Sequence, residues 1–367
     1  MKGEKMTDYA ARREMVIRSV DAEAFLAFNL EGSDPASIRY LTGFTGEGAL
    51  ILTDRQGVLL TDSRYTEQAR RETAGFPIEE SRTWTGDGLI EAFAGMGISR
   101  VSVASRRISH HFFEALGRSG KVTPVAIADP VAELRKIKSP EELASLRKAA
   151  RIAEDALIRL LDEIKIGMDE AEIALRLEWM IREGEAEGVA FPFNVSVGEN
   201  TALNHYNPFI GRRPIKRGDF LLFDFGACVD GYRSDITRTF SVGRPTGEAK
   251  EIYDAVLRAN LAAIAAVRSG MTGVEADAVA RDSIAAAGHA EHFGHGLGHG
   301  IGLEVHEAPF LSPRSKDTLG AGMTVTIEPG IYITGFGGVR IEDDIVITDE
   351  GCEVITSFPK DRLIEVG

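Results

Sequence analysis

Short apolar segments alternate with helical patterns over residues 1–130. Five segments have the length and composition of buried strands: residues 24–28, 49–53, 57–61, 101–104 and 124–127. Helical patterns cover residues 63–72 and 109–116. This alternation is typical of an α/β layer, and it lacks the glycine-rich motifs that bind phosphate. We therefore predict an α/β N-terminal domain over residues 1–130, acting as a scaffold or a lid.

A second domain is predicted over residues 131–367, after Asp129-Pro130. Its first helix has a strong start at Ser139-Pro140, because serine can cap a helix, proline fits the first turn and Glu142 can complete a capping box. The pattern then stays amphipathic to about residue 164. A similar order recurs downstream: a long apolar helix, a Gly-Met pair (residues 167–168 and 270–271) and another helix (residues 169–183 and 274–287). This weak repeat favours a pseudo-symmetric α+β domain whose halves enclose a central site.

Two aspartates of the segment FLLFDFGACVDGYRSDITRTF are predicted to share one face of a hairpin. Asp230-Gly231 is a strong two-residue turn. If it pairs Val229 with Tyr232, then Asp224 faces Thr237 and lies diagonal to Asp235. Carboxylates on one buried face repel each other unless a cation lies between them. A metal pair satisfies this need; the alternative is that Asp224 caps a turn or pairs with Arg233 or Arg238.

Two glutamates lie in similar apolar surroundings. Glu328 stands in TVTIEPGIYI and Glu342 in VRIEDDIVIT, with the turn signal Gly335-Phe336-Gly337-Gly338 between them. A hairpin centred on Gly335 places Glu328 opposite Glu342, whereas a slip of one residue separates them. Asp343 and Asp344 are competing candidates, of which Asp344 shares the face of Glu342.

Five of the eight histidines fall within HAEHFGHGLGHGIGLEVH. The glycines around His295 and His299 rule out an ordinary helix and therefore the helical zinc motif HExxH. Glycine at alternate positions permits close approach to a ligand or a strand. We take His299 as a ligand candidate and His289 and His292 as incidental. Four carboxylates and one imidazole, without thiolate, suit Mn²⁺, with Co²⁺, Fe²⁺ or Zn²⁺ feasible.

Composition excludes several classes of function. The formal net charge is −14, which argues against nonspecific binding to nucleic acid or anionic membranes. Two cysteines, Cys228 and Cys352, form neither a disulfide framework nor a CxxC site. The opening residues have no apolar core of a signal peptide, and no apolar run reaches the ~20 residues of a membrane span. We expect a cytoplasmic protein.

At this point the sequence resembles the aminopeptidase P/prolidase family of pita-bread metallopeptidases. The resemblance is carried by FDFGACVDGYRSDITRTF, HGLGHGIGLEVHE, TIEPGIYI and GVRIEDDIVI, with support from NHY (residues 204–206), RYLTGFTG (residues 39–46) and TDSRYTEQA (residues 61–69). It implies a creatinase/prolidase-type N-terminal domain followed by a pita-bread catalytic domain. It also implies that two metal ions are held by Asp224, Asp235, His299, Glu328 and Glu342.

The resemblance implies further roles. Asp235 and Glu342 correspond to bridging carboxylates, and Glu328 to the proton acceptor for the attacking water. His205, His295 and His306 match histidines that contact the substrate, and Arg340 matches an arginine supporting the cluster or substrate. The implied reaction is hydrolysis of the bond between an N-terminal residue and a following proline. Proline needs a dedicated enzyme because its nitrogen carries no hydrogen and its ring fixes φ.

Several alternatives stay open at this stage. The preferred interpretation is an Xaa-Pro aminopeptidase acting on small peptides with proline second, and the alternative is a prolidase that cleaves dipeptides only. Methionine aminopeptidase shares the ligand plan but normally lacks the first domain, and creatinase-type relatives lack the metal. A noncatalytic peptide-binding protein on the same fold is a remote alternative, because such proteins usually lose ligands. A homodimer is implied by the resemblance alone.

Overall fold

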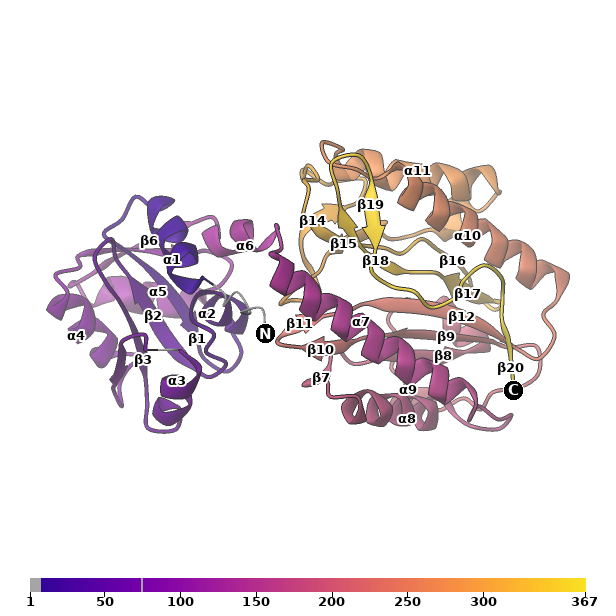
Figure 1. The fold of residues 1–367 in the computed structure, drawn as a ribbon, viewed down its shortest axis with the longest axis horizontal. Coiled ribbons are helices and arrows are strands. Elements are labelled where there is room, and N and C mark those ends of the chain that lie inside the picture. Colours follow the sequence, from indigo (N-terminus) through magenta and orange to yellow (C-terminus); the bar gives the residue numbers. More distant parts are fainter. Residues whose placement is uncertain (1–7, 74) are drawn as a thin grey trace, which may run out of the picture. The chain divides into compact units, whose positions relative to one another are not determined.

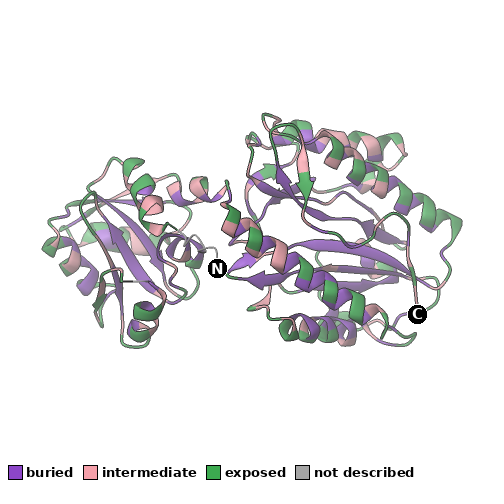
Figure 2. Ribbon diagram, viewed as in Figure 1, coloured by how far each residue is buried: buried purple, intermediate pink, exposed green. Residues whose placement is uncertain are grey.

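The computed structural model describes residues 8–73 and 75–367, so the opening segment judged not to be a signal peptide lies outside the described residues. The chain divides into two compact units, Met1–Arg135 and Lys136–Gly367. Helix α6 (Pro130–Arg135) contacts α1 and α2 and so belongs to the first unit. No described helix combines the length and apolarity needed to cross a bilayer. Each unit has a buried sheet layer under more exposed helices (Figure 2).

The first unit is built on a six-stranded sheet in the order β4-β3-β2-β1-β5-β6 (Figure 1). The neighbours β1–β2 and β2–β3 are antiparallel, and the other three pairs are parallel. Its strands are β1 (Ala24–Asn29), β2 (Gly48–Leu52), β3 (Gly57–Thr61), β4 (Ile78–Glu80), β5 (Arg100–Ala104) and β6 (Thr123–Ile127). The helices besides α6 are α1 (Tyr9–Arg18), α2 (Pro35–Thr42), α3 (Thr66–Glu72), α4 (Asp87–Gly95) and α5 (His110–Arg118).

All five predicted strands of this unit are present, each within one residue of the expected ends. The edge strand β4 was missed because its short segment is largely exposed and acidic, as edge strands often are. Helix α3 begins at Thr66 rather than at residue 63, because residues 62–64 form a turn in which the side chain of Asp62 accepts the backbone N–H of Arg64. Helix α2 was also missed, although Asp34 caps it and Pro35 occupies its first position.

The second unit contains two halves that each begin with a pair of helices and continue into strands. The first half comprises α7 (Pro140–Leu161), α8 (Glu170–Glu183), β7 (Gly188–Val189), β8 (Asn194–Val197), η1 (Gly198–Ala202), α9 (Pro208–Gly211), β9 (Phe220–Phe225), β10 (Ala227–Val229), β11 (Tyr232–Arg233) and β12 (Ile236–Val242). The second comprises α10 (Gly247–Ala266), α11 (Gly273–Ala286), η2 (Ala290–His292), β13 (Gly298–Gly300), β14 (Glu307–Leu311), β15 (Thr324–Ile327), β16 (Gly330–Ile333), β17 (Gly337–Arg340), β18 (Asp343–Ile347), β19 (Cys352–Val354) and β20 (Glu365–Val366).

Two sheets form the centre of this unit, β20-β12-β9-β8 and β14-β13-β15-β18-β19, with the smaller sheets β11-β10-β7 and β16-β17 beside them. Figure 1 shows these strands between the pair α7–α8 and the pair α10–α11. Two separate apolar cores result, because the first helix pair packs on β8, β9 and β12 and the second on β15, β17 and β18. The two halves therefore have separate cores and meet where β17 contacts β9 and β12.

The predicted repeat is visible in the details of both halves. The capping box of Ser139 and Glu142 starts α7 as expected, although the helix ends at Leu161. Gly167 and Gly270, which follow the long helices, have φ of 95° and 83°. Asp169 and Thr272 then cap α8 and α11. The repeated sequence pattern thus reflects repeated local geometry.

Gly226, between the two hairpin aspartates, is required by a close backbone approach. A Cβ at this position would lie 1.8 Å from the carbonyl oxygen of Ser234, an atom that no rotamer change can move. We expect Gly226→Ala to lower the free energy of unfolding by about 3 kcal/mol through overpacking, measured by denaturant titration. Gly247→Ala is the control, since nothing lies within 4 Å of its Cβ position at the start of α10. Equal stability of the two variants would contradict this account.

Candidate metal centre

The hairpin that carries Asp224 and Asp235 has the predicted register. Val229 pairs with Tyr232, and Asp224 pairs with Thr237. Asp230 and Gly231 adopt φ of 50° and 79°, the positive values that a tight primed turn needs. Both aspartates therefore point to one side of the hairpin, as the sequence indicated.

The two glutamates are brought together by a second hairpin. Gly330 pairs with Arg340 in β16–β17, a register that continues to place Glu328 opposite Glu342. The backbone N–H of Glu342 donates to the carbonyl of Thr237 at 3.1 Å, which joins this hairpin to the first one. The hydroxyl of Thr237 also donates to Oε2 of Glu342 at 2.5 Å. Both hairpins thus present their carboxylates to the same place.

The neighbouring acidic residues play supporting parts. Asp343 points away from the site and pairs with Arg238 at 2.8 Å, so Arg238 is not the partner of Asp224. Asp344 accepts the backbone N–H of Asp235 at 3.0 Å and lies behind the site. This contact holds the Asp235 backbone against β18. Of the three candidates in this stretch, Glu342 is the one that faces His299.

His299 comes from the short strand β13. A Cβ on the preceding Gly298 would lie 2.0 Å from the carbonyl oxygen of Thr326, so glycine allows this strand to press against β15. The ring nitrogen Nδ1 lies 3.1 Å from the carbonyl oxygen of Gly300 and must therefore carry the hydrogen. The unprotonated Nε2 then faces the carboxylates, 3.3 Å from Glu328 and 3.7 Å from Asp235.

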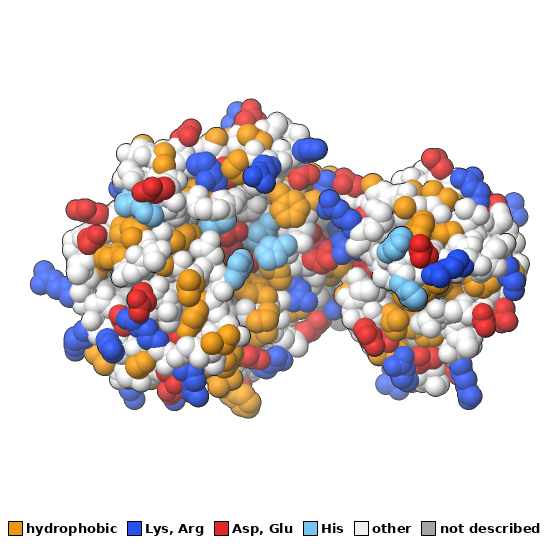
Figure 3. Space-filling view, turned by 180° about the vertical axis from the view of Figure 1, so that it is seen from behind, with side chains coloured by type: hydrophobic (Ala, Val, Ile, Leu, Met, Phe, Trp, Pro, Cys, Tyr) orange, Lys and Arg blue, Asp and Glu red, His pale blue; other side chains and the backbone are white. Residues whose placement is uncertain are grey.

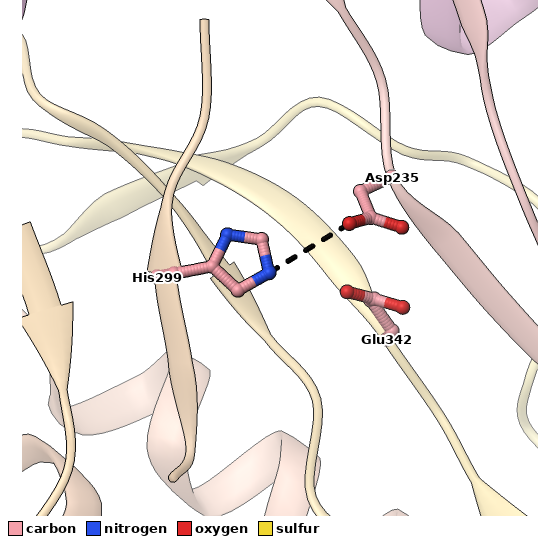
Figure 4. Close-up of side chains that lie close together, drawn as sticks. All are labelled: Asp235, His299 and Glu342. Carbon is pink, nitrogen blue, oxygen red and sulfur yellow. Dashed lines mark ion pairs between the residues drawn. The ribbon is translucent and has the colours of Figure 1, made fainter. Parts of the chain in front are cut away.

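This arrangement fits a bound cation. Ligand atoms of Asp235, His299 and Glu342 all lie within 4.8 Å of one another, and all three residues are buried (Figure 4). A nitrogen lone pair facing carboxylate oxygens is repulsive unless positive charge lies between them. In addition, Oδ1 of Asp235 is buried without a hydrogen-bond partner among the described residues. A divalent metal ion would satisfy both the lone pair and the unpaired oxygen.

The electrostatics of the site support the same interpretation. Burial raises the pKa of Asp235 and of Glu342 well above the ordinary values, and nearby carboxylates add to both shifts. Burial also raises the pKa of Glu328 to about 8 and lowers the pKa of His299 to about 3. The cluster therefore needs either protons or metal cations to neutralise it, while the imidazole stays neutral and able to bind metal.

Arg340 partly balances this negative charge and links the site to an aromatic residue. Its guanidinium donates to Asp224 at 2.6 Å and to the hydroxyl of Thr237 at 2.8 Å. It also donates to the hydroxyl of Tyr332 at 2.9 Å, which in turn lies 2.9 Å from Nε2 of His295. Asp224 therefore pairs with Arg340 rather than with Arg233 or Arg238.

Every predicted metal ligand and every residue expected to contact the substrate lines one cavity of about 690 Å³ in the second unit. These residues are Asp224, Asp235, His299, Glu328, Glu342, His205, His295, His306 and Arg340. Figure 3 shows histidine and acidic side chains gathered at a hollow on this unit. His289 and His292, judged incidental, are absent from the described lining. The cavity thus joins a buried group that fits a metal ion to side chains suited to hold a substrate.

Tyr332 is a site residue to which the sequence analysis assigned no role. Its ring lies over Gly330, where a Cβ would meet the hydroxyl at 2.5 Å. The signal was present, because the register that pairs Glu328 with Glu342 also places Tyr332 diagonal to Arg340. The tyrosine bridges Arg340 and His295 and so fixes the orientation of both.

Comparisons with known proteins decide the family. Residues 144–349 match the model of metallopeptidase family M24, and residues 21–137 match the creatinase/prolidase N-terminal domain. The chain belongs to metallopeptidase family M24. The predicted family and fold class are therefore confirmed: a creatinase/prolidase-type α/β domain precedes a pita-bread catalytic domain. M24 enzymes are metal-dependent, and the buried group of Asp235, His299 and Glu342 fits a metal site.

Relatives of both substrate types are similar to the chain. An Xaa-Pro dipeptidase from Pyrococcus furiosus is 41% identical over 335 residues, which cover 90% of this chain and 93% of the relative. An X-Pro aminopeptidase from Thermotoga maritima is 38% identical with a TM-score of 0.91, covering 97% of this chain and 99% of the other. An Xaa-Pro dipeptidase from Bacillus anthracis is 38% identical with a TM-score of 0.92, covering 98% and 100%. Identity alone does not separate the two activities.

Proposed function

We propose that five acidic and imidazole side chains of this M24 Xaa-Pro peptidase hold two divalent metal ions, with Mn²⁺ preferred. The observation that carries the proposal is the convergence of Asp224, Asp235, His299, Glu328 and Glu342 on one cavity. Such ions lower the pKa of a bound water and polarise the carbonyl that is attacked. Four carboxylates against two divalent cations leave the buried cluster neutral overall.

The remaining site residues supply proton transfer and orientation. Burial gives the carboxylate of Glu328 an unusual affinity for a proton, which suits a group that takes the proton of an attacking water. Partial burial lowers the pKa of His306, which favours the neutral form of its ring. His306 or His205 can then hydrogen-bond the departing proline nitrogen or relay a proton to it. Burial raises the pKa of Asp224, and the guanidinium of Arg340 opposes that rise and orients the carboxylate.

The charge of the cavity favours an aminopeptidase over a strict dipeptidase. A dipeptidase must bind the free carboxylate that follows proline, and an arginine or lysine is the usual partner for such a group. Among the described residues that line the cavity, Arg340 is the only arginine or lysine. Its guanidinium is already engaged by Asp224, Thr237 and Tyr332. We therefore propose substrates longer than dipeptides, with proline in the second position.

A substrate panel tests this proposal. The full-length protein is loaded separately with Mn²⁺, Co²⁺ and Zn²⁺ and assayed on Xaa-Pro dipeptides and the matching Xaa-Pro-Yaa tripeptides. We expect kcat/KM to be at least about tenfold higher for the tripeptides, because a dipeptide carboxylate would lack a cationic partner. Cleavage of dipeptides alone would identify a prolidase instead. A cytoplasmic location and a homodimer remain predictions.

A further inference from the structure

Glu170, at the start of α8, is a carboxylate with no exposed surface. Its Oε1 accepts the backbone N–H of Val197 at 2.8 Å and Nδ2 of Asn200 at 3.0 Å. Its Oε2 accepts the hydroxyl of Tyr206 at 2.7 Å and the backbone N–H of Arg213 at 2.9 Å. Each oxygen thus receives two bonds from uncharged donors, a geometry that stabilises a buried carboxylate and fixes whatever donates to it.

All four donors belong to residues 197–213, here called segment 197–213. This segment begins at the last residue of β8 and ends seven residues before β9 begins. Val197 and Arg213 stand at its two ends, and Asn200 and Tyr206 lie inside it. Asn200 also lies 3.1 Å from the hydroxyl of Tyr206, so the interior contacts form one network. A single carboxylate therefore closes the segment into a loop of defined shape.

This segment forms a wall of the active-site cavity through Asn204, His205, Tyr206 and Asn207. His205 itself is exposed, so its place is set by its neighbours. On one side, the carbonyl of Asn204 accepts Nδ2 of Asn194 at 3.1 Å. On the other side, Tyr206 is held by Glu170. Moving Tyr206 would therefore shift the imidazole relative to the metal centre.

In the second half of the unit, a residue that lines the cavity also packs against the start of the second helix, α11. There the counterpart of Glu170 is Gly273, the residue after the helix cap Thr272. A Cβ on Gly273 would lie 2.1 Å from the carbonyl oxygen of Phe310, another residue that lines the cavity. In the second half, Phe310 of the cavity wall thus packs directly against Gly273 at the start of α11. In the first half, the carboxylate of Glu170 connects the start of α8 to Tyr206 of the cavity wall. The same place in the repeat supports a cavity wall in both halves.

We propose that Glu170 is a positioning residue for the peptidase reaction, which places His205 at the metal centre by holding Tyr206 and segment 197–213. This inference rests on the proposed function. It extends that function to a residue outside the cavity lining, at the start of a helix and early in the catalytic unit.

The test is a double-mutant cycle on the full-length, Mn²⁺-loaded protein. Glu170→Gln keeps the shape of the side chain but replaces one acceptor oxygen by an NH₂ group that faces other donors. We expect it to lower kcat by about 10- to 100-fold, the range of residues that orient catalytic groups, with KM and metal content changed less than about threefold. In the His205→Ala background the same substitution should have almost no further effect, because two residues that act through one group are not additive.

Two further variants keep the test decisive. Tyr206→Phe removes one of the four bonds and should reproduce part of the loss of kcat even if Glu170→Gln does not fold. Glu172→Gln is the matched control, because this partly exposed residue of the same helix makes an ion pair with Arg176 and does not line the cavity. It should leave kcat unchanged. If the double variant lost kcat by the product of the two single-variant factors, Glu170 and His205 would act independently, and this result would overturn the inference.

Hydrogen exchange gives a readout that does not depend on activity. The amides of segment 197–213 should exchange at least about tenfold faster in Glu170→Gln than in the wild type, while those of β9 and β12 stay protected. Unchanged exchange in this segment would overturn the inference whatever the substrate. A wild type inactive on every Xaa-Pro peptide, yet with faster exchange in the variant, would instead refute the proposed function alone.

Discussion

Asp235→Asn is expected to reduce kcat/KM for an Xaa-Pro-Yaa tripeptide by at least about 10³-fold, and to release metal from the site. Asparagine keeps the volume of the side chain but removes the charge that faces His299 and Glu342. Loss of a transition-state contribution of about 4 kcal/mol corresponds to this factor, and metal chemistry supplies several kcal/mol. The measurement pairs steady-state kinetics with elemental analysis of the purified variant.

Asp230→Asn is the control for this substitution. It lies on the same hairpin, in the turn where asparagine also tolerates positive φ, so the register should persist. We expect wild-type activity and metal content from this variant. If Asp235→Asn kept more than a tenth of the wild-type activity with its metal absent, the metal would not be part of the reaction and the proposed mechanism would be wrong.

Removal of metal is expected to lower the Tm of the catalytic unit by about 8–16 °C. A ligand present at about 1,000 times its Kd stabilises the folded state by about 4 kcal/mol, and each kcal/mol shifts Tm by about 2–4 °C in a unit of this size. Without metal, the buried carboxylates of Asp224, Asp235, Glu328 and Glu342 repel each other or must take up protons. Calorimetry of the Mn²⁺-loaded and chelator-treated protein measures the difference.

The Glu342→Gln variant distinguishes this electrostatic explanation from a general loss of structure, because the two predict opposite changes in the Tm of the metal-free protein. The variant keeps an oxygen that can accept from Thr237, but it removes one negative charge from the cluster. Its metal-dependent shift in Tm should nearly vanish. In the metal-free state the variant should be at least as stable as the wild type. A metal-free variant that melts well below the metal-free wild type would contradict the electrostatic account.

The hairpin of Asp224 and Asp235 could be predicted because its geometry is local. Asp230-Gly231 selects a two-residue turn, and the period of two in a strand then fixes which side chains share a face. The register of Glu328 and Glu342 was a weaker inference, since a glycine-rich turn leaves more than one pairing open. The continuous register through Gly330 and Arg340 supports it. For His299 the sequence offered clustering alone, and the family resemblance supplied the assignment.

Contacts between segments that are distant in the sequence could not be predicted from local patterns. The link from Thr237 to Glu342 joins residues of different halves, and no local pattern encodes it. The same holds for Glu170, which reads as an ordinary acidic residue of a first helical turn. Its burial depends on where segment 197–213 folds back. In the first unit, strand β4 could not be predicted because its short acidic segment has no apolar pattern. It forms a strand through its backbone pairing with β3.

The central claim is that the convergent carboxylates and imidazole bind two divalent metal ions. Anomalous diffraction from crystals of the Mn²⁺-loaded full-length protein tests it most directly. The account predicts two anomalous peaks per chain in the cavity lined by Asp224, Asp235, His299, Glu328 and Glu342. A fully active, Mn²⁺-soaked protein with no anomalous density among these five residues would contradict it.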